Sequence, residues 1–68
     1  MTETPMDLIR KLDETATALA DLAAQVRRAA DAVTDGALRQ EMLESADGMQ
    51  TRAERMAEAI GRWRLTIQ

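Results

Sequence analysis

Apolar residues recur at steps of three and four through the first half of the chain. The run holds eight positions: Ile9, Leu12, Ala16, Leu19, Ala23, Val26, Ala30 and Val33. This spacing marks the seam of an amphipathic helix, with alanine predominant at heptad position a and larger aliphatic residues at position d. Thr4 and Pro5 supply a start, because threonine can cap a helix and proline suits its first position. The pattern predicts a first helix over about residues 5–34.

A second run of the same kind occupies the other half of the chain. Its positions are Met42, Ala46, Met49, Ala53, Met56, Ile60, Trp63 and Ile67. Alanine and isoleucine now stand at a, and methionine and tryptophan stand at d. The pattern predicts a second helix over about residues 37–66. A break near Ser45–Gly48 would give three helices instead, but the run passes through that segment in one frame, which favours a continuous helix.

The two runs are out of phase by two residues across Thr34, Asp35 and Gly36. A continuous coiled coil absorbs insertions of three or four residues, so a slip of two indicates that the chain reverses here. Gly36 can adopt a positive φ after a helix end, and Thr34 or Asp35 can cap the next helix. The expected fold is all-α: an antiparallel helical hairpin forming a single domain over residues 1–68, with short frayed termini.

The apolar stripe of this hairpin is wider than its seam, because Leu8, Leu22, Leu38 and Leu43 flank it at positions e and g. A helix with one neighbour cannot bury both seam and flanks. Sixty-eight residues without cysteine are also marginal as a solitary fold. We therefore expect a homodimer that forms a four-helix bundle. The expected core and dimer residues are Ile9, Leu12, Leu19, Leu22, Val26, Val33, Leu38, Met42, Leu43, Met49, Met56 and Ile60.

Charged side chains are distributed unevenly along both predicted helices. The first helix begins with acidic residues such as Asp7 and Asp13, and the second ends with several arginines. Folding the hairpin places the acidic start beside the basic finish, and it places Arg27 and Arg28 near Glu41 and Glu44. Exposed ion pairs contribute only about 0–1 kcal/mol each, so these charges favour the antiparallel orientation more than they add stability.

The composition argues against several classes of function. The chain has no histidine, cysteine or tyrosine and a single serine, Ser45, which leaves no familiar nucleophile–base pair and no usual zinc or iron site. We expect no enzyme activity, cofactor, metal or small-molecule substrate. A net charge of −3 gives no general attraction to nucleic acid or anionic membrane. No stretch approaches the roughly 20 apolar residues of a spanning helix, so we expect a cytoplasmic protein without a membrane partner.

These features favour a protein-interaction function. We expect an adaptor, inhibitor or regulatory accessory protein that acts through its helical surfaces and binds both itself and a larger protein. Apolar and basic side chains gather near the end of the second helix. The candidate contact residues there are Trp63, Leu65, Ile67, Arg62 and Arg64. Trp63 has two interpretations, since it continues the methionine line and could close the end of the core, or could anchor a partner.

The alternative function is a nucleic-acid-binding regulator. Its contact surface would be the arginine-rich second half of the second helix, which carries Arg52, Arg55, Arg62 and Arg64. Glutamates interleave with these arginines, and the chain offers no series of exposed aromatic residues for base stacking. Nucleic acid is therefore the less favoured partner.

Overall fold

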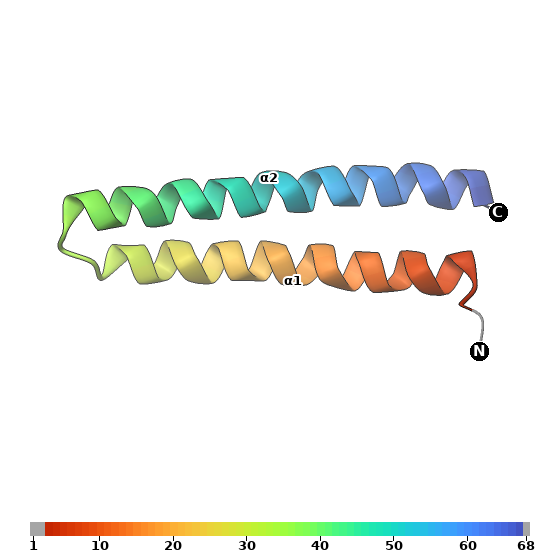
Figure 1. The fold of residues 1–68 in the computed structure, drawn as a ribbon, viewed down its shortest axis with the longest axis horizontal. Coiled ribbons are helices and arrows are strands. Elements are labelled where there is room, and N and C mark those ends of the chain that lie inside the picture. Colours follow the sequence, from red (N-terminus) through yellow and green to blue (C-terminus); the bar gives the residue numbers. More distant parts are fainter. Residues whose placement is uncertain (1–2, 68) are drawn as a thin grey trace.

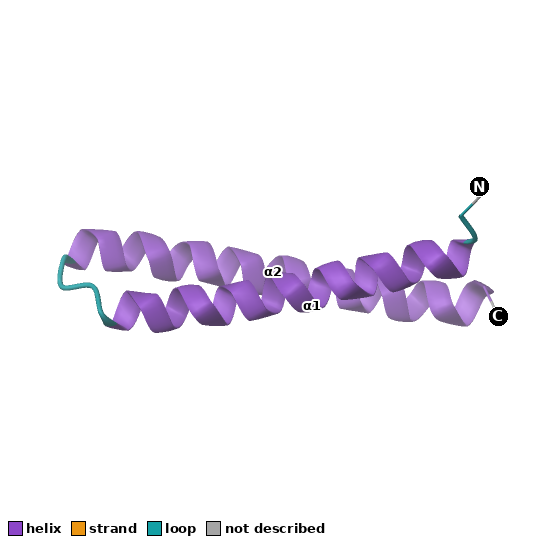
Figure 2. Ribbon diagram, turned by 90° about the horizontal axis from the view of Figure 1, so that it is seen from below, coloured by secondary structure: helices purple, strands orange, loops and turns teal. Residues whose placement is uncertain are grey.

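The computed structural model describes residues 3–67 as two long helices joined by a short turn (Figure 1). Helix α1 spans Pro5–Asp31 and helix α2 spans Gly36–Ile67. The helices are antiparallel neighbours that cross at a shallow angle (Figure 2), and the longest dimension is 49 Å. The all-α hairpin predicted from the two heptad runs is confirmed. The second helix is continuous, so the alternative with three helices was wrong.

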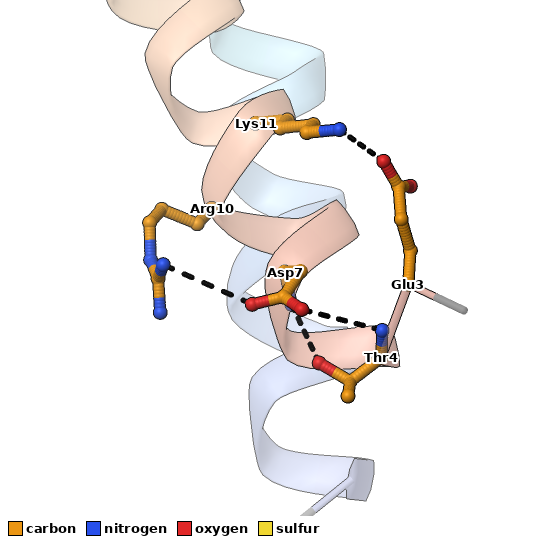
Figure 3. A network of polar contacts seen from close by, with 5 residues as sticks. All are labelled: Glu3, Thr4, Asp7, Arg10 and Lys11. Carbon is orange, nitrogen blue, oxygen red and sulfur yellow. Dashed lines mark hydrogen bonds and ion pairs between the residues drawn. The ribbon is translucent and has the colours of Figure 1, made fainter. Parts of the chain in front are cut away.

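Helix α1 begins with a capping box (Figure 3). The Asp7 N–H donates to Thr4 Oγ1 at 3.2 Å, and the Thr4 N–H donates to Asp7 Oδ2 at 3.3 Å. Each residue thus satisfies a backbone donor at the helix end. Hydrogen bonding with the Thr4 side chain, and then with its backbone, lowers the pKa of the Asp7 carboxyl. Two exposed ion pairs, Arg10–Asp7 and Lys11–Glu3, extend this network along the first turns.

Helix α1 ends at Asp31, three residues before the predicted end at about residue 34. Ala32 caps the helix with right-handed backbone angles, and the chain leaves the helix at Val33 and Thr34. Both are β-branched residues, which lose side-chain freedom in a helix and favour an exit. The Val33 carbonyl accepts hydrogen bonds from Arg39 Nε at 3.1 Å and Nη2 at 2.6 Å. Val33 is therefore a half-buried turn residue and not the last seam residue of a helix.

Helix α2 begins at Gly36 because Asp35 caps it. Asp35 Oδ1 accepts the backbone N–H groups of Ala37 at 3.0 Å and Leu38 at 3.3 Å, which are otherwise unpaired donors of the first turn. The prediction that Asp35 could cap the second helix is confirmed. The expectation of a left-handed Gly36 was wrong, since no glycine in the described part of the chain has a positive φ. The turn consists of residues 32–35.

Position a of the heptads forms the contact between the helices. The buried residues are Ile9, Ala16, Ala23, Ala30, Ala46, Ala53 and Ile60. We call this line of residues the alanine seam, since five of its seven members are alanines. Ala23, Ala30 and Ala46 are fully buried, so the methyl groups of the two helices meet without room for larger side chains. The seam therefore fixes how closely the two backbones approach.

Two ion pairs join the helices on their exposed sides. Arg64 Nη2 lies 3.1 Å from Asp13 Oδ2, and Arg27 Nη2 lies 2.9 Å from Asp47 Oδ1. The basic end of α2 thus lies beside the acidic start of α1, as the charge distribution predicted. Arg27 binds Asp47 instead of the expected glutamates of the first α2 turns. All four side chains are substantially exposed, so these pairs contribute orientation more than stability.

Replacing a central seam alanine should destabilise the hairpin. Ala23→Leu forces an isobutyl group between two touching backbones, and overpacking of this kind costs about 1–3 kcal/mol. The control is Ala18→Leu, at an exposed position of the same helix, which should change the free energy of unfolding by less than about 0.5 kcal/mol. Urea unfolding followed by circular dichroism measures both. Equal effects of the two substitutions would show that the alanine seam does not limit helix approach.

Loss of the Asp35 cap should destabilise the start of α2. Asp35→Ala leaves the N–H groups of Ala37 and Leu38 without their acceptor, which costs about 1 kcal/mol at a helix N-cap. Thr34→Ala, one residue earlier in the turn and without a capping bond, is the matched control. Thermal unfolding should show a lower midpoint for Asp35→Ala only. A comparable shift in the control would contradict the capping role.

Candidate protein-interaction surface

Large apolar side chains that the seam does not bury lie together on one side of the hairpin. Ten of them, from positions d and g, run along both helices, and we call this surface the apolar face. From α1 they are Leu8, Leu12, Leu19, Leu22 and Val26, and from α2 they are Leu38, Met42, Met49, Met56 and Trp63. Six of the ten are half-buried and four are exposed. The seam thus leaves most of the hairpin's large apolar side chains open on one side.

The two helices present these residues on the same side for a geometric reason. Position d lies next to position a around a helix, with g beyond it. Two antiparallel helices are exchanged by a rotation of 180° about an axis perpendicular to the plane that contains them both. Because this rotation does not turn the plane over, the d residues of both helices lie on the same side of it. Because position a fills the contact, the d and g lines of α1 and α2 join into one continuous surface.

Two hollows interrupt the apolar face near the open end of the hairpin, and Trp63 lines both. The first is about 220 Å³, and its lining residues are Leu12, Arg55, Met56, Ala59, Ile60 and Trp63. The second is about 280 Å³, and its lining residues are Pro5, Leu8, Ile9, Leu12, Trp63 and Ile67. Trp63 is 45% exposed. Trp63, like Leu12, therefore contributes to two concave apolar sites, and it is only partly covered by its own chain.

The opposite side of the hairpin has a different character. Its hollow, of about 240 Å³, is lined by small and polar residues: Asp13, Ala16, Thr17, Ala20, Gln50, Ala53, Glu54 and Ala57. Leu43 also belongs to this side by its heptad position e, and it is half-buried. The flanking leucines predicted as one set are therefore divided, with Leu8, Leu22 and Leu38 on the apolar face and Leu43 away from it.

The candidate contact residues near the end of α2 do not form one patch. Trp63 and Ile67 line the same hollow. Leu65 is 80% exposed and follows Trp63 by two residues, which is more than half a turn around the helix. Arg64 binds Asp13 across the helix pair. The structure thus brings Trp63 and Ile67 together and points Leu65 in another direction.

Charged side chains border the apolar face along the outer edge of α2. Glu41, Arg55 and Arg62 occupy this edge at heptad position c, whereas Arg52 lies at position g among the apolar-face positions, and all four are exposed. The ion pairs found within residues 3–67 do not include any of them. Arg55 also lines the first hollow, together with Ala59. Ala59 was not among the predicted contacts, and Arg55 was predicted only for the nucleic-acid alternative, although their positions beside the Met56 and Trp63 line would have placed both there.

The described residues offer few signs of other kinds of site. Within residues 3–67 no three histidine, cysteine, aspartate or glutamate side chains are grouped so as to hold a metal ion. Neither α1 nor α2 contains a stretch both long and apolar enough to cross a bilayer. Comparison with protein-family models, with curated proteins and with solved structures finds no match to this chain. The function is therefore inferred from the geometry of the surface.

Proposed function

We propose that this protein is a self-associating protein-interaction module. In this proposal two copies bury their apolar faces against each other and form a four-helix bundle. The observation that carries the proposal is the apolar face itself, which runs along both helices and has no partner within the hairpin. Burying one leucine side chain contributes about 1.5–3 kcal/mol, so a face with ten large apolar residues is a strong drive to associate.

The total exposed surface supports a second copy. The hairpin exposes 5181 Å². A compact monomer of this mass, 7.5 kDa, exposes about 4,250 Å² by the usual scaling of surface with mass, so the hairpin has an excess of about 900 Å². A standard protein interface buries about 800 Å² on each partner. The excess thus has the size of one interface per chain.

A larger protein is the second proposed partner, for which the dimer would act as adaptor, inhibitor or regulatory accessory. Leu65 supports this part of the proposal, because it lies outside the apolar face and is the most exposed large apolar side chain of α2. Dimerisation through the apolar face would leave it open. Arg62, one turn earlier, would supply a charged contact beside it, as at the rims of protein interfaces.

Nucleic-acid binding is the second candidate function. The observation in its favour is that Arg52, Arg55 and Arg62 are exposed on α2 and take part in none of the ion pairs within the described residues. A row of such arginines can contact successive phosphates. The net charge of −3 opposes this function, since it repels nucleic acid at long range.

Sedimentation over a dilution series should show a dimer that dissociates more readily when Leu22 is replaced. Leu22→Glu puts a charge from each copy into the apolar interface and removes two buried leucines, so the dissociation constant should rise at least about 100-fold. The matched control is Leu65→Glu, an exposed leucine of the same hairpin outside the apolar face, which should leave dimerisation unchanged. A wild-type chain that stays monomeric and fully helical at high concentration would overturn the proposal.

Salt dependence should separate the two candidate functions. We expect no binding of labelled RNA or DNA at physiological salt. The control is a variant with Arg52, Arg55 and Arg62 all replaced by glutamine, which should behave as the wild type in this assay. Nucleic-acid binding that weakens steeply with salt and is lost in the triple variant would instead establish the second candidate, because each phosphate contact adds to the salt dependence.

A further inference from the structure

We infer how the second copy docks: α2 of each copy lies antiparallel on α2 of the other, so that Leu38 of one copy enters the hollow between Leu12, Met56 and Trp63 of the other. In the same arrangement Glu41 of one copy pairs with Arg55 of the other. This inference rests on the proposed self-association and specifies its geometry. It commits to a second copy of this chain as the occupant of the hollow.

An exposed leucine at one end of α2 matches the hollow at the other end. Leu38 is 46% exposed on the apolar face at the turn end of α2, where its own hairpin gives it no further cover. The hollow at the open end is about 220 Å³ and is apolar except for Arg55. Antiparallel stacking of two copies brings the turn end of one to the open end of the other. Leu38 can then fill the hollow as a knob fills a hole.

This contact between Leu38 and the hollow imposes a register on the two α2 helices. We set Leu38 opposite Ala59, one of the residues that line the hollow. Because the two α2 helices are antiparallel, each residue further along one helix then faces a residue one earlier on the other. Glu41, three residues after Leu38, then faces Met56 and lies beside Arg55 of the second copy. Gly48 faces Met49 and lies at the two-fold axis. The Leu38 contact therefore places Glu41 of each copy next to Arg55 of the other copy. It also places Gly48 where the two α2 helices cross.

The glycine at position 48 also favours this arrangement. A glycine inside a helix costs about 1 kcal/mol relative to alanine, and a Cβ added at Gly48 would meet nothing within 4 Å. The hairpin therefore does not require glycine at this position. At the crossing of two α2 helices, a residue without a side chain lets the backbones approach closely, in the same way that the alanines do within the hairpin.

Charge complementarity favours this arrangement over the other two-fold stack. Glu41 and Arg55 are 14 residues apart on one helix, or about 21 Å, so they cannot pair within one copy. Neither takes part in the ion pairs of the described residues. With Ile9 and Ile60 at one level, stacking α1 on α2 of the second copy would instead place Lys11 between Arg55 and Arg62, so that like charges meet. Antiparallel stacking of α2 on α2 avoids this repulsion and pairs opposite charges.

The same axis also gives α1 a consistent register. Ile9 and Ile60 share one buried cluster and so mark one level of the hairpin. Twelve residues back from Ile60 is Gly48, and thirteen residues on from Ile9 is Leu22, so Leu22 lies at nearly the same level. An axis through Gly48 therefore sets Leu22 of one copy against Leu22 of the other. Both helices meet their symmetry mates with apolar-face residues in contact.

Charge reversal tests the docking geometry. Glu41→Arg and Arg55→Glu should each weaken the dimer about tenfold at low ionic strength, since each change turns two attractive pairs into repulsive ones. The double variant restores opposite charges between copies and should return the dissociation constant to within about threefold of the wild type. Sedimentation equilibrium measures all four proteins. A double variant at least as weak as the single variants would overturn the inference.

Glycine replacement gives a readout that does not depend on charge. Gly48→Gln should weaken the dimer at least about tenfold, because a side chain then separates the crossing helices. Gly61→Gln is the matched control: Gly61 lies in α2, has equally open surroundings, and faces away from the apolar face. Equal effects at the two positions would also overturn the inference. A dimer that forms without these effects leaves self-association standing, whereas a monomeric wild type would contradict the proposed function itself.

Discussion

The approach of the two helices through alanine methyl groups is the constraint on which the rest of this structure depends. Ala23, Ala30 and Ala46 are fully buried, and they bring the backbones together without interdigitating larger side chains. A contact this close has no room for the residues at position d, so Leu19, Met49 and their neighbours lie beside the contact and not within it. The small residues of the seam thus determine that the large ones form a surface.

This arrangement limits what the hairpin can gain from its own core. Among the buried residues only Ile9 and Ile60 are large, and the remaining five are alanines, whose burial removes little apolar surface from water. Two helices of this size must also offset the entropy of ordering about 60 residues, at about 1–2 kcal/mol for each backbone unit. Under the proposed self-association, a second copy on the apolar face would add this burial, and the stability of the fold would then be linked to its assembly.

The sequence was sufficient to predict two helices and their antiparallel pairing, because heptad spacing and the phase slip are properties of the chain alone. It could not show which residues of the apolar stripe a single neighbouring helix would bury and which it would leave on the surface. Positions a and d look equivalent in the pattern. In the structure position a is buried and position d is mostly half-buried, because the two helices pack together through the smaller residues. The predicted end of α1 was also wrong. Val33 continues the heptad spacing, but the Asp35 cap starts α2 only three residues after Val33, so the chain has to leave α1 earlier.

The placement of some candidate contact residues could be predicted from the sequence, and the placement of others could not. That Leu65 faces away from Trp63 follows from helical geometry and could have been predicted from their spacing. The bond between Arg64 and Asp13 could not, because several arginines at the end of α2 were equally placed to reach the acidic start of α1. Which arginine reaches Asp13 depends on how each helix is rotated about its own axis, and the packing of the alanine seam sets that rotation.

The size of the seam residues changes along the hairpin, and this change accounts for the position of the two hollows on the apolar face. Alanine faces alanine through the centre, whereas isoleucine meets isoleucine at the open end, in the cluster of Ile9 and Ile60. The distance between packed helices rises with the size of the side chains between them, so an isoleucine pair requires a wider spacing than a pair of alanines. Both hollows lined by Trp63 lie at this end. The isoleucine pair therefore serves two purposes at once: it closes the core of one hairpin and it opens the site where we place Leu38 of the next.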